Sequence, residues 1–357
     1  MKLVLLGGFL GSGKTTAIVA ACQSLIKRNR NVAIITNDQG DQQVDTAFFR
    51  STGLPVEEVM NGCFCCNYNQ LDQHLELLIN RYQPDFIFAE SAGSCTDLVA
   101  TIAKPLNDLR PELEVSISVF ADVELLASIM EGRSFFLEES VRYIYKKQLE
   151  EADILILNKV DLVTQEQLHS VEKALASEYP GKTIIRQNSM SPEGISNWLD
   201  TVENFSDHRV RKSLSVDYDI YGEGEARLAW LDKSVTINSS RNDAVFIAHK
   251  IVGFVFDGIQ QQQLPIGHLK FFLKADNWDE KISFTITSTS SNLPHQTKAS
   301  ATVTLLINAR VQTEPIILQK LVDDVLLRSE ELFDCKLVRN DWKVFKPGYP
   351  RPTHRIA

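Results

Sequence analysis

The segment GFLGSGKT, residues 8–15, constrains the fold of this chain more than any other feature. It fits the pattern G-x-x-x-x-G-K-[ST] and lies between an apolar run and a helical pattern. In a strand–turn–helix of this kind, the backbone N–H groups converge on phosphate oxygens at the positive end of the helix. We therefore predict a phosphate-binding loop formed by Gly8, Gly11, Ser12, Gly13, Lys14, Thr15 and Thr16.

The polar side chains of this loop have separate predicted roles. Lys14 reaches the β- and γ-phosphates, the Thr15 hydroxyl ligates Mg²⁺, and Thr16 binds the α-phosphate. The alternative is a glycine-rich turn without a ligand. The complete pattern in its strand–helix context favours the nucleotide site.

The first 200 residues alternate short apolar runs with helical patterns, including helices at 15–29 and 72–82. Near-continuous apolar strands separated by helices predict a doubly wound, mainly parallel α/β sheet covered on both faces. We expect strands at 2–7, 31–37, 84–91, 114–122, 152–161 and 182–189.

After residue 205 the pattern changes, because strand-like segments cluster instead of alternating with helices. This arrangement predicts a second, smaller α+β domain. We expect its strands at 215–222, 226–237, 267–276, 281–290 and 299–310, and its helices at 242–258 and 314–333. The predicted divisions are a P-loop domain at 1–205, an α+β domain at 206–335 and an irregular proline-rich tail at 336–357.

The segment NKVD, residues 158–161, ends an apolar run and indicates which base the site prefers. Asn158 and Asp161 face the base from this turn, and the alkyl stem of Lys159 lies against its ring. A carboxylate accepts hydrogen bonds from guanine N1–H and its 2-amino group, which adenine cannot offer. We predict GTP, with Asn188 of the segment 186–189 in a further loop on the base side.

P-loop enzymes need an acid at the end of another strand to hold Mg²⁺ or to position water. Glu90 in FIFAESAG is the candidate, and Gly93 lets the backbone approach a γ-phosphate; a capped helix start is the alternative. Asp38 and Asp41 follow the second strand in a loop suited to sensing the nucleotide. Solvated turn residues are the alternative for that pair.

Bulk properties limit the function classes. The net charge of −9 argues against a general nucleic-acid or anionic-membrane binder, which needs a basic face. No stretch approaches the roughly 18 apolar residues of a membrane span. We expect a soluble cytoplasmic protein, in which clustered cysteines are metal-binding or catalytic more often than disulfide-bonded.

Five motifs in order resemble the CobW-like GTPases, relatives of the UreG and HypB metal-insertion GTPases. They are GGFLGSGKTT, the acidic loop NDQGD, GCFCC, E-S-x-G and NKVD, and they span the first domain. The resemblance implies a GTPase of metal trafficking, with zinc or cobalt as cargo. Cys63, Cys65 and Cys66 match the family's C-x-C-C metal motif.

The sequence departs from the family pattern in several places. Asp38 and Asp41 match the carboxylates of the usual N-E-F-G-E loop, but each is shorter by one methylene than glutamate. Cys95 stands where many members have no cysteine, and we interpret it as a buried small apolar residue in preference to an extra ligand. His268 is the one histidine in a suggestive setting.

Thiolates suit Zn²⁺ or Cu(I), and zinc takes four ligands in a tetrahedron. The motif gives at most three, and neighbouring Cys65 and Cys66 point apart where the chain is extended. We therefore expect an open, exchangeable site completed by water, by Asp41 or by a partner. The Cys63–Cys66 spacing also fits redox chemistry, and buried structural thiols are a third interpretation.

These signals together predict a GTP-hydrolysing metallochaperone for an unknown client, in which GTP and Mg²⁺ order the 37–41 loop and so change the metal geometry. A GTP-regulated adaptor that activates a metalloenzyme or a corrinoid-dependent system without carrying metal is the alternative. A P-loop kinase is disfavoured, because NKVD specifies a base. We expect the second domain to recognise the client or to form homodimer contacts. The alternative is that it only covers a surface of the GTPase domain.

Overall fold

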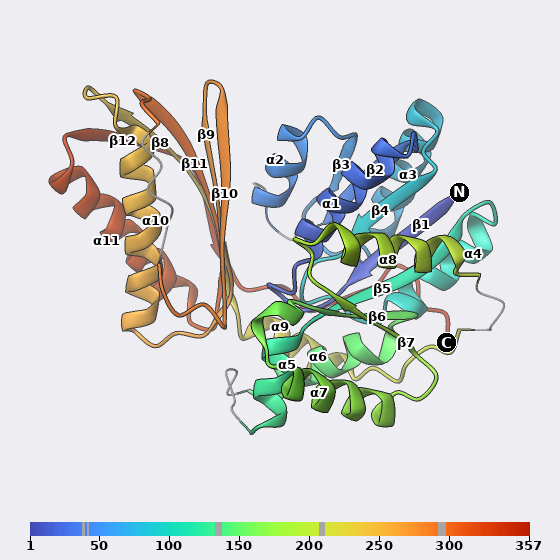
Figure 1. Cartoon of the computed structure of the whole chain (residues 1–357). Helices are drawn as coiled ribbons and strands as arrows, with labels where there is room; N and C mark the ends of the chain where they lie inside the picture. The colour runs from blue at the N-terminus through green and yellow to red at the C-terminus, as the bar shows by residue number, and fades with distance from the viewer. Residues whose placement is uncertain (38–39, 41–42, 133–137, 207–210, 292–297) are drawn as a thin grey trace. The chain divides into compact units, whose positions relative to one another are not determined.

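The computed structural model describes residues 1–37, 40, 43–132, 138–206, 211–291 and 298–357. The chain divides into two compact units (Figure 1). The first comprises Met1–Gln39, Thr52–Gly224 and Tyr349–Ala357, and the second comprises Gly40–Ser51 and Glu225–Gly348. Within the described ranges, no helix combines the length and the apolar character needed to cross a membrane.

A seven-stranded, entirely parallel sheet forms the centre of the first unit, in the order β3-β2-β4-β1-β5-β6-β7. The doubly wound sheet predicted from the sequence is therefore confirmed. Its strands are β1 Lys2–Gly7, β2 Val32–Asn37, β3 Val56–Val59, β4 Phe86–Glu90, β5 Glu114–Asp122, β6 Ile154–Asn158 and β7 Thr183–Gln187. The sequence missed β3, because its VEEV segment is short and carries two charges at the sheet edge.

Helices lie on both faces of this sheet (Figure 1). They are α1 Lys14–Lys27, α3 Tyr68–Tyr82, the π-helix η1 Val99–Ala103, α4 Lys104–Leu109, α5 Val123–Met130, α6 Glu139–Glu151, the 3₁₀ turn η2 Val160–Leu162, α7 Gln165–Glu178, α8 Pro192–Asn204 and α9 Tyr218–Ala226. Each parallel strand runs toward the same edge, so the loops that follow β1, β2, β4, β5 and β6 meet there.

The prediction of a strand at 215–222 is wrong, because this segment contains the start of helix α9. Asp217 explains the helix: its Oδ1 accepts the N–H groups of Asp219 at 3.0 Å and Ile220 at 3.2 Å. Such capping of free N–H groups at a helix start outweighs a partial alternation of apolar residues. Gly224 then packs on α6, where an added Cβ would lie 2.7 Å from Ser140 O.

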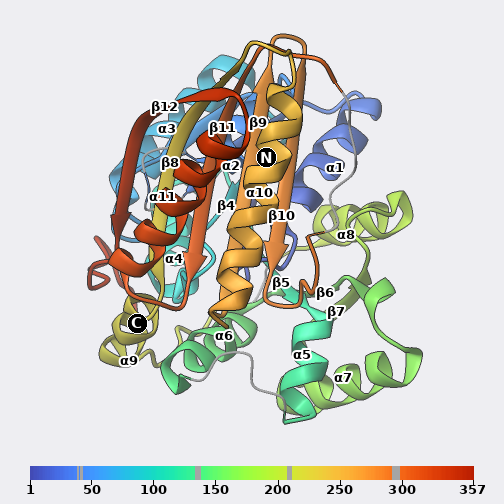
Figure 2. The same cartoon turned by 90° about the vertical axis from the view of Figure 1, so that its left-hand side faces the viewer.

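A five-stranded antiparallel sheet, in the order β10-β9-β11-β8-β12, forms the second unit. Helices α10 Ala244–Gln261 and α11 Pro315–Leu332 cover one face of it (Figure 2). This smaller unit confirms the predicted α+β class. Its strands are β8 Ala229–Ser239, β9 Ile266–Ala275, β10 Trp278–Thr285, β11 Thr302–Val311 and β12 Cys335–Phe345.

Helix α2 Val44–Ser51 belongs to the second unit, although it follows β2 in the chain. Its first N–H, at Val44, donates to Asn308 Oδ1 at 2.7 Å. Asp45 binds Lys270 Nζ at 2.5 Å and Lys281 Nζ at 2.6 Å. Burial raises the pKa of Asp45, but these two ammonium groups outweigh it and hold the pKa well below its usual range.

Two expected divisions differ from the structure. The compact units divide between Gly224 and Glu225 and not at residue 206, because most of α9 packs with the first unit. Residues 335–345 form β12, paired along β8, so the irregular tail begins only after Phe345. Its last nine residues return to the first unit.

Candidate functional site

The loop between β1 and α1 has a backbone that only glycine accommodates at two positions. Gly8 has φ 125°, and an added Cβ would lie 2.2 Å from Phe120 O. Gly13 has φ 92°, and an added Cβ would lie 2.3 Å from Asn158 Nδ2. The amino group of Lys14 lies across the loop and donates to Gly8 O at 2.6 Å. This loop is a preformed cradle in which lysine contacts backbone carbonyls that phosphate oxygens would replace.

A hydroxyl and a carboxylate meet beside this loop. Thr15 Oγ1 donates to Glu90 Oε1 at 2.9 Å, across neighbouring strands in which Leu6 pairs with Glu90. Both side chains are buried, whereas Thr16 is exposed. Hard oxygen ligands of this kind fit Mg²⁺.

Gly93, in the loop after β4, contacts the phosphate-binding loop directly. An added Cβ would lie 2.5 Å from Leu10 Cδ2 and 3.1 Å from Leu10 Cα. The Gln148 side-chain amide from α6 fixes this loop by donating to Gly93 O at 3.0 Å and to Cys95 O at 2.8 Å. No motif marks Gln148, because its partners lie more than 50 residues away.

Asn158 joins the loops on the base side. Its Nδ2 donates to Ser12 O at 2.8 Å, and its Oδ1 accepts Ser189 N at 3.0 Å. Asp161 is exposed in η2. Asn188 itself accepts from Met190 N at 2.8 Å, so Ser189 is the residue of this segment that contacts NKVD.

Lys159 adopts a left-handed backbone, with φ 64°, and its ammonium group donates to Asp122 Oδ2 at 2.6 Å. Asp122 ends β5, pairs with Asn158 across the sheet and caps α5. The pattern search missed Asp122, although an acid at the end of the run 114–122 was a usable signal. Holding Lys159 in this way fixes the stem predicted to lie against a base.

The three cysteines of the C-x-C-C motif converge, contrary to the expected divergence of Cys65 and Cys66. The Sγ atoms lie 2.7 Å apart for Cys63–Cys65, 3.1 Å for Cys63–Cys66 and 3.9 Å for Cys65–Cys66. The reason is that the segment is a turn and not an extended chain: the N–H groups of Cys66 and Asn67 both donate to Cys63 O. In the part of the chain that the structure describes, these three residues form the group of donor side chains compact enough for a metal ion.

The thiols influence one another because they are close and buried. Hydrogen bonds from Cys65, Cys66 and Cys95 hold the pKa of Cys63 well below its ordinary value. The bond with Cys63 raises the pKa of Cys65 well above its ordinary value and that of Cys66 to about 11. Three sulfur atoms thus lie close together in one turn, and as thiolates they are soft ligands that suit zinc.

Asn37, the last residue of β2, holds the cysteine turn from one side. Its Nδ2 donates to Val59 O at 3.2 Å and to Gly62 O at 2.7 Å, and its Oδ1 accepts Phe64 N at 3.0 Å. Two of these three hydrogen bonds of one buried amide reach the turn, and the third reaches the end of β3. Asn37 ends the strand predicted at 31–37, but no motif indicates its role at the cysteine turn.

The C-terminal residues hold the cysteine turn from another side. Thr353 donates its N–H to Cys65 O at 2.8 Å and its hydroxyl to Cys66 O at 3.0 Å. Arg351 N lies 3.3 Å from Cys66 Sγ. The residues after Phe345 form no helix or strand, and no motif predicted that they dock on the cysteine turn.

Two predicted site residues, and a histidine in a suggestive setting, remain to be placed. Asp38 and Asp41 lie outside the described residues. His268 lies in β9 of the second unit, where it pairs in register with Arg310 and is buried.

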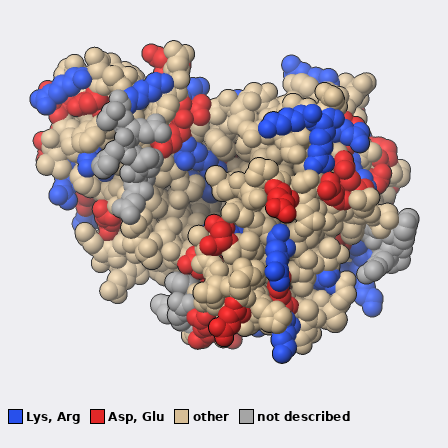
Figure 3. Space-filling model, in the orientation of Figure 1, with Lys and Arg blue, Asp and Glu red and all other residues tan. Residues whose placement is uncertain are grey.

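Charged side chains of both signs are scattered over the face shown in Figure 3.

Known proteins resemble part of this chain. It is 29% identical over 177 residues to the zinc chaperone YeiR of Escherichia coli, covering 47% of this chain and 49% of that protein. It is 28% identical over 192 residues to the zinc chaperone CobW of a Sinorhizobium species, covering 48% of this chain and 54% of that protein. The chain thus spans about half the length of these curated relatives.

Among solved structures, the hydrogenase maturation factor HypB of Archaeoglobus fulgidus aligns with 57% of this chain and 89% of its own, at 17% identity and a TM-score of 0.42. The family described as CobW/HypB/UreG, nucleotide-binding domain, matches residues 2–186, which is more than half of the chain. This match covers the phosphate-binding loop, the cysteine turn and NKVD. The chain belongs to the CobW/HypB/UreG family of nucleotide-binding P-loop proteins.

Proposed function

We propose that this chain is a GTP-binding and GTP-hydrolysing metallochaperone that delivers a transition metal, zinc above others, to a client protein. The family match and the relatives named zinc chaperones support the general class. The preference for GTP rests on Asn158, Lys159 and Asp161 at the base side of the loop cluster. The preference for zinc rests on the thiol cluster, because soft thiolates in a tetrahedral set favour zinc, with cobalt as the second choice.

The observation that carries this proposal is the position of Asn37. This residue ends β2 and leads directly into the 38–41 segment, which we propose responds to the nucleotide. The same side chain makes two hydrogen bonds to the turn that carries the cysteines and a third to Val59 at the end of β3. A change at the nucleotide site that moves the end of β2 therefore changes the backbone that positions the thiols.

Nucleotide binding supplies such a change. Lys14 exchanges Gly8 O for phosphate oxygens, and Thr15 and Glu90 would hold Mg²⁺, which neutralises charge on the β- and γ-phosphates. A nucleotide shifts metal affinity only if it binds two arrangements of the chain with different affinities. The effect is reciprocal, so bound metal alters GTP affinity by the same factor.

The proposal is tested by measuring zinc binding and GTP hydrolysis on the full chain and on a variant in which Cys63, Cys65 and Cys66 are all serine. Competition with a chromophoric chelator reports zinc, and phosphate release reports hydrolysis. We expect one tightly bound zinc in the wild type, none in the variant, and GTP binding in both. Equal zinc binding in the two proteins would contradict the metallochaperone role. If the wild type binds and hydrolyses GTP but binds no zinc, the result would favour the alternative function, a GTP-regulated adaptor that carries no metal.

A further inference from the structure

Residues 349–357 of the tail cross the cysteine turn and belong to the same compact unit as the turn. We call this segment the strap. Where it crosses, Thr353 bonds the carbonyls of Cys65 and Cys66, and the Arg351 N–H donates to Cys66 Sγ at 3.3 Å. The strap therefore contacts both the backbone and a sulfur atom of the candidate metal site.

The strap lies on the side of the thiol cluster from which solvent reaches a sulfur. Cys63 and Cys65 are 3% and 2% exposed, whereas Cys66 is only partly buried. A metal ion, a chelator or a thiol reagent therefore reaches the cluster by way of Cys66. Because the strap bonds the sulfur and the carbonyl of that residue, it lies in this path.

We propose that the strap is a gate for metal exchange at the cysteine turn, and that the ion pair between Arg355 and Asp97 is its latch. The strap lifts from Cys66 before a metal ion enters or leaves, and closes again afterwards. This inference rests on the proposed function, in which the cysteine turn binds metal. Arg355 is a positioning residue, because it acts on the thiols only through the strap.

The latch joins a buried carboxylate to a guanidinium at the surface. The Asp97 side chain is 0% exposed and that of Arg355 is 33% exposed. Asp97 Oδ2 accepts from Arg355 Nε and from Tyr218 OH, each at 2.8 Å. A hydrogen-bonded ion pair with a buried partner holds more firmly than an exposed pair, because water cannot readily replace the lost cation at the buried carboxylate.

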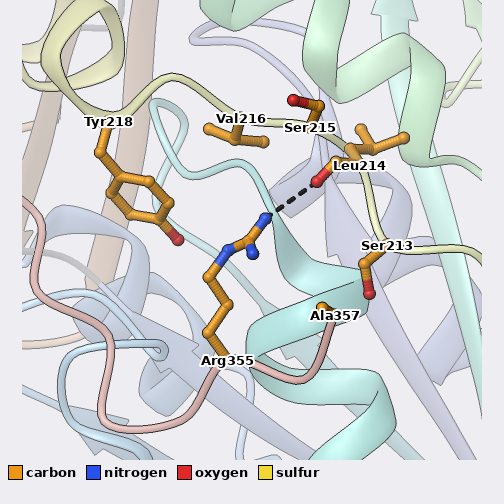
Figure 4. Close-up of a pocket in the computed structure, with 7 residues that line it drawn as sticks. All are labelled: Ser213, Leu214, Ser215, Val216, Tyr218, Arg355 and Ala357. Atoms are coloured by element: carbon orange, nitrogen blue, oxygen red, sulfur yellow. Dashed lines mark hydrogen bonds between the residues drawn. The ribbon is translucent and has the colours of Figure 1, made fainter.

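The latch faces a pocket and not the core of the unit (Figure 4). This pocket, of about 450 Å³, is lined by Ser213, Leu214, Ser215, Val216, Tyr218, Arg355 and Ala357. The Arg355 guanidinium donates to Leu214 O at 2.9 Å and lies beside the Tyr218 ring. It can leave Asp97 for this pocket without displacing core side chains, so the latch can open while the fold stays intact.

Further bonds fasten the strap on either side of the crossing. Before it, Tyr349 OH donates to Asp219 Oδ1 of α9 at 3.0 Å. After it, Ile356 N donates to Ala100 O at 2.9 Å, and Ser213 Oγ donates to Ile356 O at 2.6 Å. The two fastened ends hold the middle of the strap against the turn, so loosening one end allows the middle to lift.

Proline keeps the middle of the strap extended. Pro350 and Pro352 flank Arg351, and each has a fixed φ. A residue before proline is itself restricted to extended conformations, which applies to Arg351. The Arg351 N–H therefore meets Cys66 Sγ at a small cost in conformational entropy, and the strap closes readily after each opening.

A gate of this kind changes the rates of metal exchange and not the affinity. Both bonds of Thr353 reach backbone carbonyls, so a metal ion on the sulfurs leaves them in place. The strap therefore closes over the empty and the loaded turn alike, and opening the latch speeds entry and exit of zinc by the same factor. A residue that only shapes the metal site would instead change the dissociation constant for zinc.

Alkylation of the metal-free full chain with N-ethylmaleimide tests the strap without any metal. The rate at Cys66, followed by fragment-ion mass spectrometry, reports how often the strap is open. In Arg355→Ala and in Asp97→Asn we expect Cys66 to react about 10-fold faster, because each variant loses a hydrogen bond between charged groups. Asparagine tolerates the left-handed backbone at position 97, where φ is 68°, and its oxygen still accepts from Tyr218.

The matched control is Arg351→Ala, which removes an arginine side chain from the same strap but keeps the latch and the N–H at position 351. It should react at the wild-type rate. Stopped-flow exchange of zinc with a chromophoric chelator then tests the gate. We expect loading and release both to be about 10-fold faster in Arg355→Ala and in Asp97→Asn, with an unchanged dissociation constant for zinc.

Equal alkylation rates in the wild type, Arg355→Ala and Asp97→Asn would overturn the gate and leave the proposed function intact. Equal acceleration in Arg351→Ala would assign the effect to charge and overturn the latch. A changed dissociation constant for zinc would overturn the gate in favour of a structural role. If the wild type binds no zinc, the proposed function fails, while the alkylation rates still decide whether the strap covers Cys66. Binding of fluorescent GTP shows that each variant is folded; if Arg355→Ala is not, Asp97→Asn decides.

Discussion

The nucleotide site and the thiol cluster lie in the same compact unit but are built differently. The nucleotide site uses residues within short motifs, each at the end of a parallel strand, and the sheet topology brings the strand ends together. The thiol cluster takes three cysteines from one turn, and tertiary contacts from Asn37, Cys95 and the tail complete its surroundings. The difference teaches that a site can be recognised from a motif while its coordination and its control depend on residues outside that motif.

Lys14→Ala separates the two sites with the largest expected effect. Lysine contributes its charge to the phosphates of the reacting nucleotide, so we expect GTP hydrolysis to fall by about 10³-fold or more. Zinc affinity without nucleotide should not change, because the hydrogen bonds of Lys14 to Gly8 O and Phe9 O stay within the phosphate-binding loop. Phosphate release and a zinc titration measure the two effects, with Lys27→Ala as the control. Loss of nucleotide-free zinc binding would mean that the sites are not separate.

Asp161→Asn should lower GTP affinity by ~100-fold, because a charged acceptor of two hydrogen bonds becomes an amide that repels one donor. The same amide can donate to the 2-carbonyl of xanthine, so affinity for xanthosine triphosphate should rise. Fluorescent-nucleotide competition measures both. An unchanged preference for GTP over the xanthine nucleotide would show that NKVD does not bind the base.

Gln148→Leu should affect both sites. It removes two buried hydrogen bonds, to Gly93 O and Cys95 O, and we expect the free energy of unfolding to fall by about 2 kcal/mol. Because these carbonyls flank the phosphate-binding loop and Cys95, GTP and zinc affinities should each fall by roughly 10-fold. Denaturant unfolding and the two titrations measure this. A loss confined to GTP binding would show that the loop carrying Cys95 does not influence the cysteine turn.

Thr353→Val has the smallest expected effect. It removes the hydroxyl bond to Cys66 O but keeps the Thr353 N–H bond to Cys65 O. A single exposed hydrogen bond contributes about 1 kcal/mol, so zinc should dissociate about 5-fold faster. Stopped-flow transfer of zinc to a chelator measures the rate, and Thr201→Val, which breaks a similar bond on α8, is the control. Equal rates in all three proteins would show that the tail does not restrain the turn.

Sequence patterns predicted the first unit well because its signals are local. Two strands, at 2–7 and 114–122, have the bounds that the structure shows. The strand expected at 215–222 failed because Asp217 caps a helix there, and β12 was missed because its charged sequence pairs only along β8 at a sheet edge.

The candidate sites divide in the same way. Thr15 and Glu90 meet as expected, because strand order places the ends of β1 and β4 side by side. Cys65 and Cys66 converge because backbone bonds to Cys63 O form a turn, which an extended-chain argument cannot anticipate. Asn37, Gln148 and Thr353 belong to no motif, because their hydrogen-bond partners lie at least 22 residues away in the sequence and meet them only in the folded chain.

The central claim is that the nucleotide controls metal affinity through Asn37. Its most direct test is the zinc affinity of the wild type and of Asn37→Asp, each with a non-hydrolysable GTP analogue and with GDP, using Asn204→Asp on α8 as the control. We predict that the zinc affinities measured with the GTP analogue and with GDP differ by about 5–150-fold in the wild type and in the control, the usual range of coupling between sites. We call this quotient of the two zinc affinities the ratio. In Asn37→Asp, which loses the amide donors to Val59 O and Gly62 O, the ratio should approach one. Equal zinc affinity in both nucleotide states of the wild type would contradict the account.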